Sequence, residues 1–415
     1  MIKTEGYRKE WKAMKGNLIL IHGGGPTAVI NASLAGAIRQ AKKEPNVDRI
    51  LAAIGGTGGL MRGQVRDLTD ITEEELALLE RTPGSAIGTS RDALEEPEYR
   101  LLAEKCVELG AKYVLMNGGN GTMDACGKLC RMLAGTDIRV MGIPKTMDND
   151  IAVTDHAPGF GSAARYIAQS VAEVTADVRG LPIHVVVIEA SGRNAGWITA
   201  ASALARQAGV DGPDLIYLPE TDFSMPKFIE DVKKVYNATG NCIVAVSEGI
   251  HYEDGGFVSE AKVAANDGFG HAQLGGLATI LAEVLKEETG AKVRGIELNL
   301  LQRCAAHLAS ETDIEESYMA GKVAVENAVN GINGRMIGFE RGIQNGKYAC
   351  RTKLVPLVEV ANVEKKIPRE WINEEGNGVN HQFIEYALPL IQGEPELPKQ
   401  DSLPRFVKLK KVLAK

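Results

Sequence analysis

Residues 144–150, with the sequence "PKTMDND", combine a lysine, a threonine and two aspartates in a way that suits phosphoryl transfer to an alcohol. Such a reaction needs a carboxylate near the attacking hydroxyl and cations facing the oxygens of the transferred group. Asp148 and Asp150 are two residues apart, so in an extended segment their carboxylates share one face. Lys145 and Thr146 place a cation and a hydroxyl beside them. The alternative is a surface turn, but the apolar run "IRVMGI" directly before the segment favours a site.

A glycine-rich loop, "GGNGT", stands earlier in the chain at residues 118–122. Gly119 and Gly121 carry no side chain, so the backbone there can approach an anion closely, and we expect Thr122 to open the next helix as its N-cap. A second loop of this kind, "HGGGPTAVINA", follows another apolar run. Two such loops after two strands favour a phosphate-binding cradle over coincidental turns.

The loop "HGGGPTAVINA" also allows a different interpretation. Gly23, Gly25 and Ala28 satisfy a loose dinucleotide fingerprint, and Asp48 stands at about the distance expected for a ribose contact. Pro26 is unusual in such a turn. A nicotinamide-dependent oxidoreductase is therefore an alternative, although it explains none of the later motifs.

The composition limits the class of protein. A chain of 415 residues is longer than one core of about 250–300 residues supports, so we expect two domains. The net charge of -7 disfavours nucleic-acid binding, which normally needs a basic surface. No apolar run approaches the ~20 residues of a membrane span, and residues 1–16 lack the apolar core of a signal peptide. We therefore expect a cytoplasmic protein that does not contact membranes. The six cysteines are too few and too scattered for a disulfide framework. Cys126 and Cys130 stand four apart on an expected helix and could face one metal, but no Cys or His lies at zinc-like spacing, so we expect them to pack.

Apolar runs that end in glycine-rich loops and lead into helical periodicity recur along the chain. This alternation predicts a parallel sheet covered by helices on both faces, with ligands beyond the carboxyl ends of the strands. The loop "PGFG" before a long helix marks the first domain boundary, and residues 394–415 are expected to form a tail packed on the surface. The expected strands are "NLILIH", "RILAAI", "KYVLM", "IRVMGI", "IHVVVIEA", "DLIYLP", "CIVAVSEG" and "VRGIELNLL".

A set of short motifs resembles the phosphofructokinase family from about residue 17 to about residue 331. In the family's order they are "GGGPTAVINA", "GTSR", "GGNGT", "PKTMDND", "GFGSAAR", "GRNAGW", "SEG" and "LLQR". The residues of these motifs, together with the length of the chain, are most similar to the long branch of the family, which contains pyrophosphate-dependent enzymes. The resemblance implies an α/β fold with two Rossmann-like, three-layer domains and mostly parallel sheets. It implies a donor-binding domain of residues 1–160 and about 302–355, and a sugar-phosphate-binding domain of residues 161–301 and about 356–415.

The resemblance also implies roles for the residues of the aspartate-rich motif. Asp148 matches the general base that takes the proton of the sugar's C1 hydroxyl, and Lys145 matches a cation that stabilises the leaving phosphate. Thr146 matches a ligand of the transferred phosphate or the sugar. Asp150 and Asn120 match the positions that hold Mg²⁺, the implied cofactor, although most members have an aspartate where Asn120 stands.

Donor contacts are implied for the glycine-rich loops. Gly25 and Arg91 match contacts to the donor phosphate, and Gly119, Gly121 and Thr122 form the second donor loop.

The implied sugar contacts come mostly from the second domain. Arg294 and Arg303 match the cations that hold the sugar's 6-phosphate, and a planar guanidinium suits a phosphate dianion. Arg294 usually reaches in from a neighbouring subunit, so the resemblance implies a homodimer or homotetramer. Further substrate contacts are implied for Thr146, Asp148, Asp150, Ser191, Gly192, Arg193 and Glu248.

Some positions depart from the family's pattern on the sugar side. Leu300 replaces the usual His or Tyr before the arginine of "QR", Ser191 replaces a common Met, and His184 stands where many members have an arginine. The resemblance favours fructose 6-phosphate as the acceptor and fructose 1,6-bisphosphate as the product, the glycolytic reaction of a 6-phosphofructokinase. A related kinase acting on another sugar phosphate is the alternative.

Two positions bear on the phosphoryl donor. Pyrophosphate users typically have an aspartate where Gly121 stands, whose carboxylate takes the place and the charge of the ATP α-phosphate, so glycine leaves room for a nucleotide. Lys145 is instead typical of pyrophosphate users. Lys145 can stabilise the transferred charge with either donor, so the space left at Gly121 decides the prediction. We therefore expect ATP as the donor, with pyrophosphate as the alternative. A protein that binds both ligands without turnover is a further alternative, against which the intact aspartate-rich motif speaks.

Overall fold

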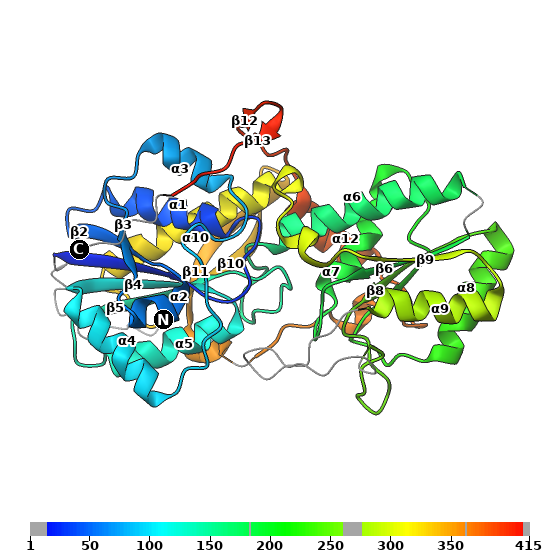
Figure 1. Ribbon diagram of the computed structural model, residues 1–415, viewed down its shortest axis with the longest axis horizontal. Helices are drawn as coiled ribbons and strands as arrows, with labels where there is room; N and C mark the ends of the chain where they lie inside the picture. Colours follow the sequence, from blue (N-terminus) through cyan, green and yellow to red (C-terminus); the bar gives the residue numbers. More distant parts are fainter. Residues whose placement is uncertain (1–14, 182–183, 260–275, 362, 410–415) are drawn as a thin grey trace.

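A computed structural model describes residues 15–181, 184–259, 276–361 and 363–409. Figure 1 shows two lobes side by side, each built on one sheet with helices on both faces. The expected α/β class, with two mostly parallel sheets, is confirmed. Ile183, at the start of one expected strand, and the two ends of the expected domain ranges, 1–14 and 410–415, lie outside the described residues.

The larger sheet has the strand order β11-β10-β5-β4-β1-β2-β3. Its inner strands run parallel, while β3 and β11 are antiparallel to their neighbours at the two edges. The apolar runs predicted the four central strands, whereas β3, β10 and β11 were not predicted. The strands are β1 (Gly16–His22), β2 (Val47–Ala53), β3 (Val65–Asp67), β4 (Ala111–Gly118), β5 (Arg139–Pro144), β10 (Arg335–Gln344) and β11 (Lys347–Pro356).

Alternate residues of β1 explain why this strand reads as continuously apolar. Leu18 and Leu20 pack against helices of one face, and Ile19 and Ile21 pack against helices of the other. The first face is covered by α1 (Ile30–Ala41), α3 (Glu73–Glu80) and α10 (Glu311–Val329), and the second by α2 (Gly56–Met61), α4 (Glu96–Glu108), α5 (Asn120–Met132) and α11 (Leu357–Val360). Cys126 of α5 is buried in the second layer and Cys130 packs against it partly buried, as expected for packing cysteines.

The smaller sheet is entirely parallel, with the order β7-β8-β6-β9. Its strands are β6 (Val185–Ala190), β7 (Leu215–Tyr217), β8 (Cys242–Ser247) and β9 (Val293–Glu297). Helices α6 (Phe160–Arg179) and α7 (Trp197–Ala200), continued by η1 (Ala201–Ala208), cover one face. Helices α8 (Met225–Thr239) and α9 (Leu277–Thr289) cover the other.

The chain passes between the lobes more than once (Figure 1). After β9, the short helices η3 (Asn299–Arg303) and η4 (Ala306–Leu308) lead to α10, which packs on α1 of the larger lobe. After α11 the chain returns to the smaller lobe through η5 (Arg369–Trp371), α12 (His381–Ala387) and η6 (Leu388–Ile391). The expected division into two discontinuous domains stays a prediction.

The C-terminal tail lies on the surface of the larger lobe, as expected. It forms the small antiparallel pair β12 (Lys399–Gln400) and β13 (Leu403–Pro404). The backbone N–H of Val407 donates to Thr82 Oγ1 at 2.9 Å, and Arg405 lies 3.3 Å from the carboxylate of Glu74. Across the four described ranges, we find no helix with the length and apolar character that crossing a bilayer requires.

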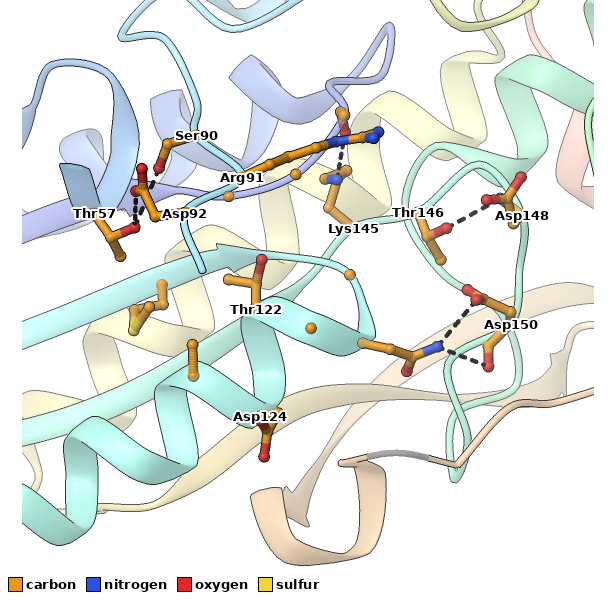
Figure 2. Close-up of a pocket in the computed structure, with 18 of the residues that line it drawn as sticks. Thr57, Ser90, Arg91, Asp92, Thr122, Asp124, Lys145, Thr146, Asp148 and Asp150 are labelled. Atoms are coloured by element: carbon orange, nitrogen blue, oxygen red, sulfur yellow. Dashed lines mark hydrogen bonds between the residues drawn. The ribbon is translucent and has the colours of Figure 1, made fainter. Parts of the chain in front are cut away.

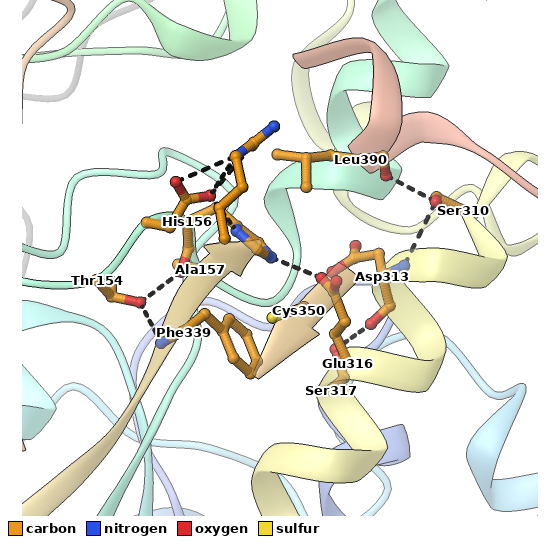
Figure 3. Close-up of polar contacts among 12 residues, drawn as sticks. Thr154, His156, Ala157, Ser310, Asp313, Glu316, Ser317, Phe339, Cys350 and Leu390 are labelled. Atoms are coloured by element: carbon orange, nitrogen blue, oxygen red, sulfur yellow. Dashed lines mark hydrogen bonds and ion pairs between the residues drawn. The ribbon is translucent and has the colours of Figure 1, made fainter. Parts of the chain in front are cut away.

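A buried charge network joins the turn that carries His156 to β10, β11 and α10 (Figure 3). The Nδ1 atom of His156 lies 2.8 Å from the carboxylate of Asp155, and its Nε2 atom lies 2.6 Å from Glu316. The Tyr348 hydroxyl donates to Glu316 at 2.7 Å, and Arg341 contacts Asp155 at 3.1 Å. Burial alone would lower the pKa of His156, but the two carboxylates raise it above the ordinary value of 6.5. Because a carboxylate oxygen lies within hydrogen-bond distance of each ring nitrogen, the geometry favours the doubly protonated ring, which can donate to both.

We expect His156→Asn to lower the free energy of unfolding by about 3–5 kcal/mol, because it leaves the buried carboxylate of Glu316 without its cation. Since the pKa of His156 is raised in the folded state, the stabilisation is complete below the ordinary value of 6.5 and is lost as pH rises through the raised value. Denaturant unfolding at about pH 6 and about pH 9 measures both effects. His381→Asn, at an exposed histidine, is the control, and equal losses in the two variants would contradict the expectation.

Candidate active site

A cleft of about 750 Å³ lies at the carboxyl ends of β1, β4 and β5, where loops of the smaller lobe complete its wall. This is the position at which open parallel sheets bind ligands. Most of the predicted site residues line it: Gly25, Arg91, Gly119, Asn120, Gly121, Thr122, Lys145, Thr146, Asp148, Asp150, Arg193, Glu248 and Arg303.

Three cations surround the glycine loop after β1. Lys145 Nζ donates to the carbonyl oxygen of Gly25. Gly24 adopts a φ of +73°, a left-handed conformation that favours glycine, and so turns the loop toward the lysine. A Cβ on Gly25 would lie 3.2 Å from a guanidinium nitrogen of Arg303 and 3.4 Å from one of Arg91. The loop therefore offers open backbone and positive charge at one place, which suits a phosphate group.

Asp148 and Asp150 lie in the turn that follows Lys145 (Figure 2). The N–H of Asp148 donates to Thr146 Oγ1 at 3.1 Å. Burial, together with the nearby carboxylates of Asp150 and Glu248, raises the pKa of Asp148 to about 7, although Lys145 opposes the shift. A carboxyl group with a pKa near neutrality is suited to accept a proton from a substrate hydroxyl.

Lys145 is the buried positive charge beside these carboxylates. Burial lowers its pKa to about 8, while the attraction of Asp148 and Asp150 keeps the pKa from falling further. The lysine is thus a cation at neutral pH, and its side chain is buried beside the two aspartates. In such a site a charge acts more strongly on developing negative charge than it does in bulk water.

The residues at the start of α5 differ from their expected roles. The helix begins at Asn120 with Gly119 as its cap, so Thr122 lies inside the first turn and the expectation that it is the N-cap is wrong. Gly119 has extended backbone angles, which let the helix begin three residues earlier than an N-cap at Thr122 would. A Cβ on Gly121 would meet no heavy atom within 4 Å, so this position opens into the cleft.

Asn120 is placed beside the second aspartate. Its Nδ2 atom donates to the carboxylate of Asp150 at 3.0 Å. Its Oδ1 atom is buried and has no hydrogen-bond partner among the described residues. Burial also raises the pKa of Asp150. A half-buried carboxylate next to an unpartnered amide oxygen is an oxygen-ligand set of the kind that hard cations such as Mg²⁺ prefer.

The smaller lobe contributes two charged side chains to the cleft. Glu248 Oε1 accepts from the N–H of Gly192 at 3.2 Å, and burial raises the pKa of this carboxyl. Arg193 lies over the ring of Phe257 at 5.1 Å. Ser191, which does not line the cleft, is tied to Gln302 by a 2.6 Å hydrogen bond to its hydroxyl. Gly192 also lies behind the cleft wall, where it orients Glu248.

Arg294 is not part of this cleft. It is exposed on β9, the edge strand of the smaller sheet. Leu300 and Leu301 follow it in η3 and are 56% and 60% exposed. His184 lies at the amino end of β6, where its ring packs near Tyr236, rather than at the carboxyl ends that form the cleft.

Asn194 and Glu364 are among the residues that line the cleft although the sequence did not single them out. The Nδ2 atom of Asn194 donates to Glu364 at 2.8 Å. The charge of Glu364 contributes to the raised pKa of Asp150. Glu364 lies in "NVEKKIP", where neither a glycine loop nor a strand-like run could have drawn attention to it.

Asp48 does not contact the cleft, contrary to the dinucleotide interpretation. It lies near the amino end of β2 and pairs with Lys15 at 2.8 Å. Elsewhere in the described part of the chain, His156, Glu316 and Cys350 are the one group of His, Cys, Asp or Glu ligands that lie within 4.8 Å of one another. None of these three lines the cleft.

Comparison with known proteins agrees with this geometry. Residues 17–326 match the family described as phosphofructokinase. The chain belongs to the phosphofructokinase family. It is 39% identical over 408 residues to a protein of Halomonas elongata named pyrophosphate–fructose 6-phosphate 1-phosphotransferase, a match that covers 95% of this chain and 96% of that protein.

Two further relatives of this phosphofructokinase family member bear on its chemistry. A protein of Alkalicoccus urumqiensis named sulfofructose kinase is 32% identical over 360 residues, covering 85% of this chain and 90% of that one. The crystal structure of a pyrophosphate-dependent phosphofructokinase from Nitrosospira multiformis superposes with a TM-score of 0.88 at 37% identity, covering 97% of this chain and 98% of that one. As a member of this family, the chain is a phosphotransferase enzyme, so neither an oxidoreductase nor a binding protein without turnover is retained.

Proposed function

We propose that the enzyme transfers a phosphoryl group from pyrophosphate to the C1 hydroxyl of fructose 6-phosphate, giving fructose 1,6-bisphosphate. The observation that carries this proposal is the pairing, in one cleft, of the half-buried carboxyl of Asp148 with the buried cation Lys145. Proton removal from an alcohol and charge stabilisation on a phosphoryl group need these two functions side by side.

In the proposed mechanism Asp148 takes the proton of the C1 hydroxyl as the oxygen attacks the phosphoryl group. Lys145 and Arg91 face the oxygens on which negative charge develops. The first N–H groups of α5, at Asn120 and Gly121, receive the leaving phosphate, because a helix N-terminus binds anions. Thr146, whose side chain lines the cleft between the two aspartates and the lysine, is a ligand of the transferred group.

The sugar is held by the smaller lobe in this proposal. Glu248 accepts from sugar hydroxyls and Arg193 contacts the sugar, while Arg303 binds the 6-phosphate. Arg294 would come from a second copy of the chain. The exposed leucines 300 and 301 beside it support a covered surface there, so we propose a homodimer or homotetramer, which the molar mass in solution tests.

Mg²⁺ is the proposed cofactor, with Asn120 and Asp150 as its protein ligands. Bound Mg²⁺ would neutralise part of the charge on the donor phosphates. Because Asn120 is uncharged where most members have an aspartate, the site lacks one carboxylate. Glu364, which lines the cleft and acts electrostatically on Asp150, supplies a negative charge in its place.

The donor is the point on which this proposal departs from the sequence-based expectation of ATP. Two of the relatives described above are named for pyrophosphate, and three cations are gathered at the single loop of Gly25, as a compact donor requires. ATP is the second candidate. It is favoured by the open space at Gly121 and by a cleft that continues past this residue to Leu94, Tyr99 and Lys128.

A coupled assay of fructose 6-phosphate with pyrophosphate and with ATP, each with and without Mg²⁺, tests the function and the donor together. We expect kcat/KM for pyrophosphate to exceed that for ATP by at least about tenfold, a difference of about 1.4 kcal/mol, and chelation of Mg²⁺ to abolish turnover. A preference for ATP would establish the second candidate instead. Gly121→Asp should then remove use of ATP and retain pyrophosphate, whereas the uncharged Gly121→Asn control separates steric from charge exclusion.

The acceptor is tested in the same assay. The relative named sulfofructose kinase motivates a panel that includes a sulfonated fructose and other sugar phosphates. Fructose 6-phosphate should give the highest kcat/KM. We further propose the cytoplasm as the location, a role in glycolysis, and the division into a donor-binding and a sugar-phosphate-binding domain described above.

A further inference from the structure

We infer that Lys365 and Tyr386 are positioning residues. Through hydrogen bonds to the side chain of Asn149, they hold the turn that bears Asp148 and Asp150. Both residues lie beyond residues 17–326, the part of the chain that matches the family. The inference rests on the proposed function for its kinetic readout, and a second readout below does not depend on that function.

Asn149 is the point at which the catalytic turn is held. It is fully buried, and its φ of +53° places it in the left-handed region that few side chains adopt without support. Its Nδ2 atom donates to the Tyr386 hydroxyl at 2.8 Å. Its Oδ1 atom accepts from the N–H of Ala157 at 3.0 Å and from Lys365 Nζ at 3.3 Å. The side chain between the two aspartates is thus fixed from three directions.

Lys365 reaches several points of the same loop. Its Nζ atom donates to the carbonyl oxygens of Asp155 at 2.7 Å and of Thr154 at 3.3 Å, as well as to Asn149. Its backbone N–H donates to the carbonyl of Asp150 at 2.8 Å. One residue therefore contacts both ends of the loop, and an ammonium is suited to gather several carbonyl oxygens because it has three donors and no acceptor.

Lys365 itself is held in place by the smaller lobe. Its Nζ atom lies 5.0 Å from the centre of the Trp197 ring, and the indole Nε1 donates to its carbonyl oxygen at 2.9 Å. A cation over the face of a tryptophan ring is attracted by the ring's quadrupole. The position of the ammonium is consequently set by packing that the loop itself does not provide.

Tyr386 of α12 contacts the same loop from another direction. Its hydroxyl accepts from Asn149 and donates to the carbonyl of Asp155 at 2.7 Å. Its ring packs against Trp197 and Trp371, with centroids 5.2 Å and 5.4 Å away. Tyr386 and Lys365 thus both donate to the carbonyl of Asp155 and both bond the side chain of Asn149, while they approach from different elements.

Asp148 and Asp150 flank Asn149, so a shift at Asn149 moves both carboxylates. A misplacement of about 1 Å at a reacting group costs on the order of a hundredfold in rate, while binding of the substrate through other residues is retained. Loss of the support should therefore lower kcat more than it raises KM.

Lys365→Met, which keeps most of the apolar stem, should lower kcat by about 10- to 100-fold and change KM for fructose 6-phosphate by less than about threefold. Ethylammonium added to Lys365→Ala should restore part of kcat, since it supplies an ammonium in the vacated space. Lys366→Met, at the exposed neighbouring lysine, is the control and should leave kcat unchanged. A defect in KM alone, or a defect that follows loss of folded protein in thermal unfolding, would overturn the inference.

Tyr386→Phe keeps the ring packing and removes only the hydroxyl. We expect a loss in kcat of about three- to tenfold and a loss in the double variant smaller than the product of the two single losses, because both residues act on Asn149. Hydrogen exchange of residues 148–157 should accelerate at least about tenfold in Lys365→Met. Unchanged exchange and unchanged kcat would refute the inference. Accelerated exchange in an enzyme that does not use fructose 6-phosphate would support the inference while the proposed function failed.

Discussion

Replacing Asp148 with asparagine should lower kcat by about 10² to 10⁴, because the variant keeps the shape of the side chain but cannot accept the proton of the sugar hydroxyl. KM for fructose 6-phosphate should change by less than about fivefold, since the loss falls in the transition state. Steady-state kinetics with purified enzyme measures both. Asp124→Asn is the matched control: it lines the same cleft, but its carboxylate pairs with Lys128 at 2.7 Å.

The pH dependence gives an independent check on the same residue. A base must be deprotonated to act, and the pKa of Asp148 is raised to about 7, so kcat/KM should fall as pH drops through this value. In Asp148→Asn the residual rate should lose this acidic limb. If the limb persisted in the variant, or if kcat fell by less than about tenfold, another group would be the base.

Lys145→Met should lower kcat by about 10² to 10³, the cost of removing one preorganised group that stabilises charge in the transition state. The lysine Nζ donates to the Gly25 carbonyl at the donor loop, so KM for the phosphoryl donor should rise as well. Arg206→Met, which removes a cation outside the cleft, is the control. A variant that retained more than about a tenth of kcat would show that the other cations are sufficient.

The same variant should also move the pH profile. Lys145 attracts the ionised form of Asp148 and so keeps its pKa lower than burial alone would set it. Without the lysine the pKa of Asp148 rises further, and the acidic limb of kcat/KM should shift to higher pH. A shift to lower pH would contradict the assigned electrostatics.

Much of the fold could be predicted because its strands are buried on both faces. The run from Leu18 to Ile21 reads as continuously apolar for this reason, and the glycines after it mark the carboxyl end where the cleft lies. In β11, by contrast, most residues are exposed or half-buried, so this antiparallel edge strand has no apolar run to reveal it. Side-chain burial, which only the folded sheet determines, separates the two cases.

Some residues of the candidate site could be predicted from the sequence, and others could not. Lys145, Asp148 and Asp150 are adjacent in the chain, so their common chemistry could be recognised before their geometry was known. Glu364 and Lys365 could not be found in this way, because their relation to Asp150 arises only when a distant segment pairs with the loop, in the bridge between Ile151 and Glu364. The capping role expected of Thr122 failed for a local reason, since extended backbone at Gly119 lets α5 begin earlier.

The support of Asn149 by Lys365 and Tyr386 has a consequence for synthesis of the protein on the ribosome. Lys145, Asp148 and Asp150 emerge before the lysine and the tyrosine that hold their turn, which follow the whole of residues 17–326. Domains generally fold as they emerge, N-terminal parts first. A nascent chain that has exposed every family motif would therefore still lack an ordered catalytic turn, and the turn would be held only once Lys365 and Tyr386 had emerged as well.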